Sequence, residues 1–276
     1  MLIRVGHSPD PDDAFMFWAL ADGRIDTNGF EFEQVLRDIQ TLNEWAHEGR
    51  LEVTAISAHT YPFVQDTYLL LPHGGSFGSG YGPVVVAGRA LSHDELRHTE
   101  IVVPGVGTTA FLVLRFFLGG EFSYRVLPFD EILPEVMEGK AEAGLLIHEG
   151  QLTYGSHGLR KVVDLGEWWL LDTGLPLPLG LNVIRRDLGD ENIHRVSEIL
   201  RRSIETGLEA RDEALDYALQ FGRGLDHRLA DRFVGMYVND WTLDFKPRGR
   251  QAVAQFLAEG HEAGVLPELV VPEFVK

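Results

Sequence analysis

Cysteine is absent from the 276 residues of this chain, and its absence excludes several kinds of site together. A chain without thiols has no disulfide, no thiolate-bound metal, no iron–sulfur cluster and no cysteine nucleophile. Long hydrophobic runs are also missing, because no segment approaches the roughly 18 apolar residues of a membrane span. The N-terminus, MLIRVGHSPDPDD, has no apolar stretch of signal-peptide length, so we expect a cytoplasmic protein.

Basic residues are scarce as well. The chain has 24 Lys and Arg against 42 Asp and Glu, which gives a net charge of −18. Nucleic acid is therefore not expected as a partner, because phosphates need a basic face. A small anionic substrate is compatible with this charge, since salt screens distant charges within about 8 Å and backbone amides bind anions locally. The composition does not indicate any oligomeric partner.

The motifs of several enzyme classes are missing. No H-E-x-x-H or comparable spacing occurs, so we expect no metal ion. The glycine-rich segment 73–82 lacks the lysine of a phosphate-binding loop, and no G-x-S-x-G motif marks a serine hydrolase.

Strands and helices alternate along the first part of the chain. Segments 2–5, 30–36 and 52–57 have the short apolar pattern of strands, and segments 12–25 and 38–49 have that of helices. This order predicts an α/β fold with mostly parallel sheets.

The same order returns about 90 residues later, where EGKAEAGLLI (138–147) is the counterpart of EGRLEVTAIS (48–57). Two such units predict two lobes, with crossovers at 82–88 and 181–184 and with helices after residue 187. A cleft between two lobes joined by two crossover strands is the plan of periplasmic binding proteins. The predicted division of the chain is 1–86 with 184–276 in the first lobe and 87–183 in the second.

The ligand site is expected where strands end, because open α/β sheets bind ligands beyond the carboxyl ends of their strands. Four segments lie at such ends: GHSPDPDD (6–13), SAHTY (57–61), GVGTTA (105–110) and HEGQLTY (148–154). In a two-lobed molecule these segments would face one another across the cleft.

The segment GVGTTA is open to three interpretations. Thr108 or Thr109 can cap the helix that follows, whose free N–H groups and dipole attract a carboxylate or phosphate. Gly105, Gly107 and Ala110 also match the G-x-G-x-x-A spacing of a nicotinamide dinucleotide site. The third interpretation is an ordinary helix cap without a ligand.

Titratable residues at the other strand ends are further candidates. His148 would lie at a strand's carboxyl edge, as a general base or as a structural histidine bound to the backbone. His7 and His59 are weaker candidates for ligand contact. Asp10, Asp12 and Asp13 either stabilise the start of a helix or accept hydrogen bonds from sugar-like hydroxyls.

Five longer segments carry a family pattern: HSPDPDDAFMFWAL, TLNEWAHEGRLEVTAIS, VPGVGTTAF, LLIHEGQLTY and VVDLGEWWLLDTGLPLPLG. In them the chain resembles, over nearly its whole length, the 1,4-dihydroxy-6-naphthoate synthases of the futalosine route to menaquinone. The resemblance implies a cytoplasmic, cofactor-independent lyase with a type II periplasmic-binding-protein fold. It also implies a reaction, the cleavage of a carbon–carbon bond that converts cyclic dehypoxanthinylfutalosine to 1,4-dihydroxy-6-naphthoate.

The resemblance also assigns site residues. It makes His148 the proton acceptor, Thr108 and Thr109 a substrate-binding pair, and the strand end Ala55, Ile56 and Ser57 a further substrate contact. We also expect contacts from Ser8 and Asp12.

The chain departs from the family pattern near its N-terminus. Better-known members read Ser-Pro-Cys-Pro-Asn-Asp-Thr-Phe there, whereas this chain has Asp10 for Cys, Asp12 for Asn and Ala14 for Thr. The substrate contacts of the first lobe are therefore open. One alternative is a relative of chorismate dehydratase, although HEGQLTY and DTGLPLPLG favour the synthase. Another is a cytoplasmic solute-binding or sensor protein for a small carboxylate, and a third is a nicotinamide enzyme.

Overall fold

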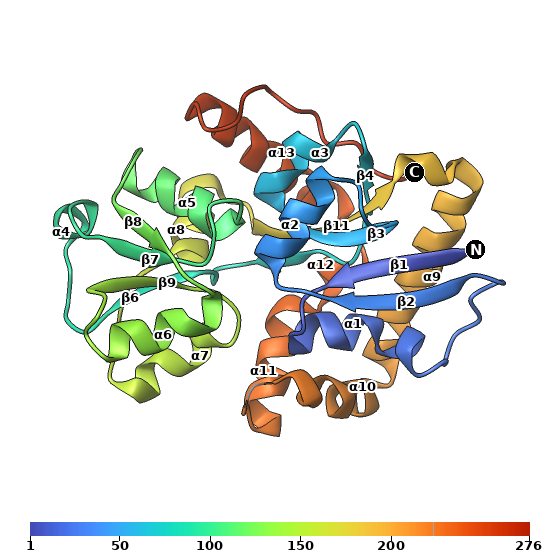
Figure 1. Ribbon diagram of the computed structural model, residues 1–276, viewed down its shortest axis with the longest axis horizontal. Coiled ribbons are helices and arrows are strands. Elements are labelled where there is room, and N and C mark those ends of the chain that lie inside the picture. The colour runs from blue at the N-terminus through green and yellow to red at the C-terminus, as the bar shows by residue number, and fades with distance from the viewer. Residues whose placement is uncertain (223) are drawn as a thin grey trace.

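The structure is a computed structural model that describes residues 1–222 and 224–276. It is an α/β molecule with two sheets and helices packed on them (Figure 1). The strands are β1 (Leu2–His7), β2 (Glu31–Leu36), β3 (Val53–Ser57), β4 (Tyr68–Leu70), β5 (Ser76–Gly78), β6 (Val84–Ala87), β7 (Ile101–Val103), β8 (Tyr124–Val126), β9 (Ala143–Leu146), β10 (Arg160–Asp164) and β11 (Leu177–Arg185). The helices are α1 (Pro11–Ala21), α2 (Ile39–His47), α3 (Tyr61–Val64), α4 (His93–Arg97), α5 (Thr109–Leu118), α6 (Phe129–Met137), α7 (Gly150–Thr153), α8 (Leu165–Thr173), α9 (Asp190–Glu209), α10 (Arg211–Ala218), α11 (His227–Tyr237), α12 (Asp240–Leu243) and α13 (Lys246–Glu262).

The two sheets share one strand order. The first is β2-β1-β3-β11-β4, with β5 also paired to β11, and the second is β8-β7-β9-β6-β10. β1 is parallel to β2 and β3, as β7 is to β8 and β9, whereas β11 and β6 are antiparallel to their neighbours. The repeat in the sequence is therefore a repeat of topology. In each sheet, one antiparallel strand lies beside the strand–helix–strand–helix–strand unit.

The chain passes between the sheets twice, before β6 and again before β11. The lobe limits predicted at 86/87 and 183/184 fall inside these two strands. All of β6 belongs to the second sheet and all of β11 to the first, so the sheets change a few residues earlier than those limits. Figure 1 shows the two bodies of the molecule side by side, with the crossing segments between them.

β11 is longer than the strand expected at 181–184 and includes Pro178. Its pairing with β5 shifts register between Pro178 and Gly180. Proline has no N–H for the ladder and is tolerated near the start of a strand or at a bulge. The strand therefore begins four residues before the segment predicted from the sequence.

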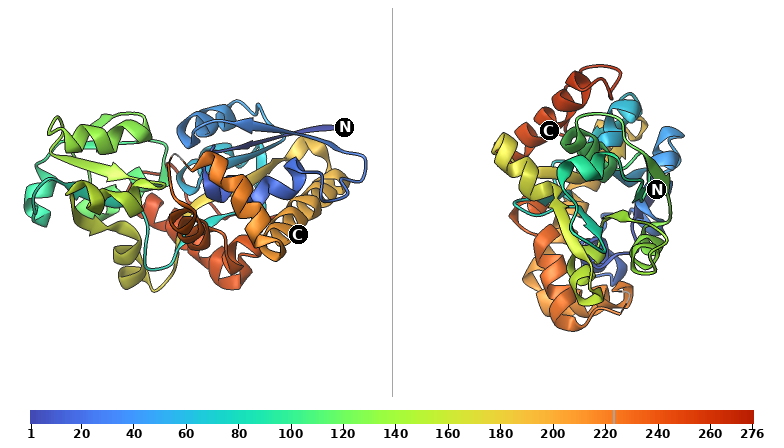
Figure 2. Two further views of the ribbon diagram at one scale, coloured as in Figure 1. Left: turned by 90° about the horizontal axis from the view of Figure 1, so that it is seen from below. Right: turned by 90° about the vertical axis from the view of Figure 1, so that its left-hand side faces the viewer.

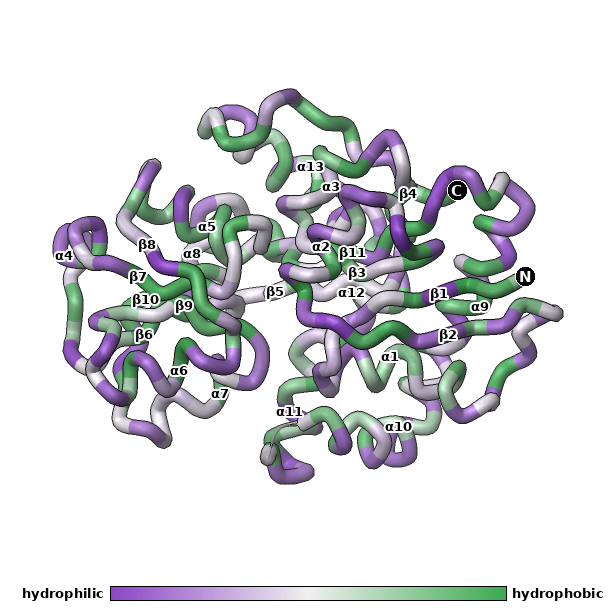
Figure 3. Tube along the Cα trace, viewed as in Figure 1, coloured by the Kyte–Doolittle hydropathy of each residue, from purple (hydrophilic) through white to green (hydrophobic). Residues whose placement is uncertain are grey.

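Helices pack on both sheets, as the views in Figure 2 show. α1 begins at Pro11, a residue suited to the first helical turn because that position needs no N–H. Phe15 and Phe17 of α1 are fully buried, and α1 packs against α9 and α10, two of the helices expected after residue 187. Figure 3 shows hydrophobic stretches along β6 and β9 in the second sheet. Within the described residues no helix is long and apolar enough to cross a membrane.

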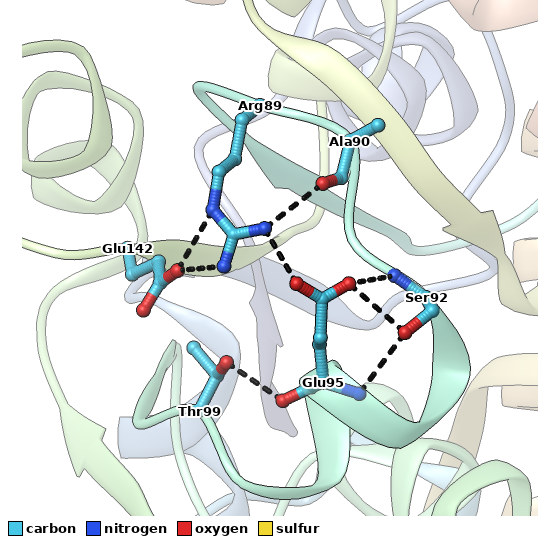
Figure 4. A network of polar contacts seen from close by, with 6 residues as sticks. All are labelled: Arg89, Ala90, Ser92, Glu95, Thr99 and Glu142. Atoms are coloured by element: carbon cyan, nitrogen blue, oxygen red, sulfur yellow. Dashed lines mark hydrogen bonds and ion pairs between the residues drawn. The ribbon is translucent and has the colours of Figure 1, made fainter.

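A polar network fixes α4 at the far end of the second sheet (Figure 4). Ser92 Oγ accepts from the Glu95 N–H at 3.2 Å, and the Glu95 carboxylate accepts from the Ser92 N–H at 2.8 Å, which is a capping box. Arg89 donates to Glu95 at 2.8 Å and to Glu142 at 2.6 Å. The Ser92 N–H and the Arg89 guanidinium lower the pKa of Glu95 to about 2.

Candidate active site

A cavity lies between the two sheets at the carboxyl ends of their parallel strands. Its walls come from the segments after β1, β3, β7 and β9, from β11 and from α11. It encloses about 730 Å³ of empty space, including its open mouth. The four segments selected from the sequence therefore meet at one place.

Most of the predicted contact residues line this cavity: Ser8, Asp12, Ala55, Ser57, Thr108, Thr109 and His148. Ile56 does not, because its side chain is fully buried in the hydrophobic core. Side chains alternate across a strand, so Ala55 and Ser57 share a face that Ile56 cannot share. The position of Ile56 thus gives no support to the substrate contact predicted for it.

His148 stands at the turn from β9 into α7. Its φ of 55° is uncommon for a residue with a side chain. Nδ1 lies 3.1 Å from Oδ2 of Asp10, and Nε2 is buried without a hydrogen-bond partner among the described residues. The ring of Phe129 packs edge-on against the imidazole at 4.8 Å between centroids. One nitrogen is therefore held and the other is available, as a general base requires.

The three aspartates after β1 have different roles. Asp10 is the N-cap residue of α1, yet its side chain makes no capping hydrogen bond with that helix. Asp13 Oδ2 accepts from the Ser8 N–H at 2.8 Å. Asp12 lines the cavity, and its Oδ1 is buried without a hydrogen-bond partner in the described part of the chain.

Burial and mutual repulsion shift the acidities of this cluster. Burial, then the charges of Asp13 and Asp10, raise the pKa of Asp12 well above its usual range. Burial and the charge of Asp10 raise the pKa of Asp13 to about 7. A protonated Asp12 can donate a hydrogen bond to a ligand in the cavity, which a carboxylate cannot do.

The two threonines at the start of α5 act differently. Thr108 Oγ1 accepts from the Phe111 N–H at 3.2 Å and donates to the Gly105 carbonyl at 2.8 Å, so Thr108 is the cap. Thr109 Oγ1 donates to the Leu179 carbonyl at 2.7 Å, which joins α5 to β11. Both residues line the cavity, where the N-terminus of α5 provides a positive end for an anionic group.

The glycine turn before α5 is explained by a close approach between the two halves. A Cβ on Gly105 would lie 2.3 Å from Oε1 of Gln40, and the Gly107 N–H donates to that oxygen at 3.2 Å. The second sheet also has antiparallel pairs, unlike the parallel sheet of a dinucleotide-binding domain. The nicotinamide interpretation therefore has no support from the fold.

Several cavity residues were not found from the sequence. Asn182, Phe233 and Tyr237 line the cavity, as does Gln151, whose carboxamide forms a hydrogen bond of 2.7 Å with the Tyr237 hydroxyl. Gln151 lies in the selected segment 148–154, so its place could have been suspected. Phe233 and Tyr237 are four residues apart on α11, a spacing that indicates only packing until the fold is known.

His7 and His59, the other histidines at the strand ends, are both buried. His7 is fully buried, with Nδ1 2.9 Å from the Ser8 carbonyl and Nε2 3.2 Å from Gln34 Oε1. Burial lowers the pKa of His59 to about 4. Neither residue lines the cavity. Within residues 1–222 and 224–276, no group of three or more His, Asp or Glu is arranged to hold a metal ion.

The fold and the cavity define a two-lobed protein of the periplasmic-binding-protein class. A crystal structure of a protein from Archaeoglobus fulgidus has a TM-score of 0.92 at 46% identity, over 96% of this chain and 98% of that one. The alkanesulfonate-binding protein of Xanthomonas axonopodis pv. citri, bound to MOPS, has a TM-score of 0.73 at 12% identity, over 98% and 96%. The second comparison concerns the fold alone, and it confirms the predicted architecture.

Within this class the chain belongs to the menaquinone biosynthesis family, whose model matches residues 3–262. A 1,4-dihydroxy-6-naphthoate synthase of Thermus thermophilus is 43% identical over 273 residues, 99% of each chain. The synthase of Streptomyces coelicolor is 36% identical over 272 residues, 97% of this chain and 95% of the relative. The family resemblance seen in the sequence is confirmed.

Proposed function

We propose that the protein is a cofactor-independent carbon–carbon lyase that converts cyclic dehypoxanthinylfutalosine to 1,4-dihydroxy-6-naphthoate in menaquinone biosynthesis. Both relatives are named as this synthase, and each matches the chain over nearly its whole length. The structural observation that carries the proposal is His148, which lines the cavity with Nδ1 paired and Nε2 without a partner among the described residues.

The cavity offers the groups that this chemistry needs. Carbon–carbon cleavage with aromatisation requires removal of an acidic proton and stabilisation of the resulting enolate. Nε2 of His148 accepts the proton. The N-terminus of α5, at Thr108 and Thr109, holds a substrate carboxylate and so fixes its orientation. A protonated Asp12 donates to a substrate oxygen.

The same proposal covers the location of the enzyme and the closure of its two lobes. The enzyme acts in the cytoplasm, as a biosynthetic role in this family suggests. Its predicted lobes, 1–86 with 184–276 and 87–183, close over one small anionic molecule. Cavity residues from both sheets support this arrangement.

The test is to incubate the purified protein with cyclic dehypoxanthinylfutalosine and to search for the naphthoate by mass spectrometry. Product formation proportional to enzyme and time supports the proposal. Binding measured by calorimetry without any product would instead indicate a solute-binding or sensor protein. Turnover of chorismate in a parallel reaction would indicate the dehydratase, and either outcome would overturn the lyase assignment.

A further inference from the structure

We propose that Asp10 is the positioning residue of the base: it holds the His148 imidazole with hydrogen on Nδ1, so that Nε2 is the nitrogen that takes the substrate proton. This inference rests on the proposed function, in which His148 is the base, and it adds the residue that makes the base competent.

The pair joins the two halves of the molecule. Asp10 follows β1 of the first sheet, whereas His148 follows β9 of the second. Asp10 Oδ2 and His148 Nδ1 are 3.1 Å apart, the Asp10 side chain is 1% exposed, and that of His148 is 17% exposed. A contact this well buried is shielded from the water and salt that weaken surface pairs.

Asp10 occupies a position where an aspartate would ordinarily serve its own helix. Asp38 and Asp226 do so, because their side chains accept from the Thr41 and Leu229 N–H groups at the starts of α2 and α11. Asp10 is also an N-cap residue, but its side chain makes no such bond with α1. Oδ2 of Asp10 lies instead 3.1 Å from Nδ1 of His148, so the carboxyl group is placed beside the imidazole.

The charges around the pair favour this role. The negative charge of Asp10 contributes to the raised pKa of both Asp12 and Asp13, which lie beside it in the cluster. A carboxylate at this place stabilises the imidazolium that forms when the base is protonated.

The proton balance follows from the geometry. The substrate loses a proton to Nε2, whose lone pair forms the new N–H bond, and the electrons of the broken bond stay on the substrate as an enolate. Nδ1 keeps its hydrogen beside Oδ2 of Asp10, 3.1 Å away. The Phe129 ring packs edge-on against the imidazole, so this packing and the Asp10 carboxyl group 3.1 Å from Nδ1 together orient the ring.

The first test compares Asp10→Asn with Asp38→Asn, which alters an aspartate that only caps a helix. We expect Asp10→Asn to lower kcat by about 100-fold with KM changed less than about threefold, because the amide can favour the wrong tautomer. Asp38→Asn should leave both constants near wild type. Wild-type kcat in Asp10→Asn would overturn the inference while leaving the proposed function intact.

The second test reads the tautomer directly, by ¹⁵N NMR of histidine-labelled protein with His148→Gln as the assignment control. The inference is supported if Nδ1 of His148 carries the hydrogen in the wild type and no longer does so in Asp10→Asn. A neutral wild-type ring with hydrogen only on Nε2 would overturn the inference. In the double variant Asp10→Asn with His148→Gln, activity should equal that of His148→Gln alone, since a positioning residue has no effect without its base. A further loss in the double variant would show that Asp10 acts independently of His148. If the wild type forms no product, the proposed function fails, and the NMR result still decides whether Asp10 holds the imidazole.

Discussion

Replacing Asp13 with Asn should change how stability depends on pH. Burial and the charge of Asp10 raise the pKa of Asp13 from 3.8 to about 7 in the folded protein. The unfolded chain therefore releases this proton near pH 4 while the folded chain keeps it. Stability must fall as pH rises from about 4 to about 7, because the folded state binds more protons in that window. Asp13→Asn removes this dependence and keeps an oxygen that can accept from the Ser8 N–H.

The magnitude follows from the displacement of about three pH units between the unfolded and folded states. Each unit corresponds to 1.36 kcal/mol, so the whole window is on the order of 4 kcal/mol. Measurements at pH 6 and pH 9 avoid the sequence pI of 4.9. Between these two values the free energy of unfolding should change by about 1 kcal/mol, because only the interval from pH 6 to pH 7 lies below the folded-state pKa of Asp13.

The assay is urea unfolding of wild type and Asp13→Asn at pH 6 and pH 9, with Asp38→Asn as the matched control. Between pH 6 and pH 9 we expect the free energy of unfolding of the wild type to fall by about 1 kcal/mol more than that of Asp13→Asn. Asp38→Asn should differ from the wild type by a constant amount. The same dependence of stability on pH in wild type and Asp13→Asn would refute the argument that burial and the charge of Asp10 raise the pKa of Asp13.

Three further predictions concern the stability of the fold. Ser92→Ala removes the capping box of α4 and should lower the free energy of unfolding by about 1 kcal/mol in urea titration, whereas Ser92→Thr should retain most of it. Gly166→Ala puts a Cβ 2.0 Å from the Tyr81 carbonyl oxygen and should cost about 1–3 kcal/mol in the same titration, whereas Gly88→Ala meets nothing within 4 Å and should cost less than about 0.5. Equal values for the two glycine variants would contradict the steric argument. Thr109→Val loses the hydrogen bond to the Leu179 carbonyl and should lower the melting temperature, with a free-energy loss of about 1 kcal/mol that Thr109→Ser does not share.

The position of the candidate site could be predicted because the carboxyl ends of parallel strands meet at one edge of a sheet. Residues that follow buried strands collect at one edge of a sheet, so Ser8, Ser57, Thr108 and His148 could be grouped without any knowledge of distances. The same regularity could not orient side chains within a strand. The resemblance that indicated Ala55, Ile56 and Ser57 as one contact did not separate them either, and the side chain of Ile56 faces the core.

The partnership of Asp10 with His148 could not be read from the chain. Capping preferences are local and explain an aspartate before a proline-led helix equally well. The choice between capping and pairing depends on how the second half of the molecule approaches, which is a tertiary property. Tyr237 was missed for a related reason, since a helix in the last third of the chain gives no sign of which cavity it reaches.

The extent of β11 was misjudged because proline usually indicates a loop. Pro178 enters the strand at an irregular register, where no ladder hydrogen bond from its nitrogen is needed. Such tolerance depends on the neighbouring strand, β5, which the sequence did not predict.

The central claim is that His148 removes a proton from a small anionic molecule held in the cleft. The most direct measurement is single-turnover product formation by His148→Gln with cyclic dehypoxanthinylfutalosine, alongside calorimetric binding of the same molecule. We expect product formation to fall by at least about 100-fold while the dissociation constant changes less than about threefold. Product formed by His148→Gln at the wild-type rate would contradict the account.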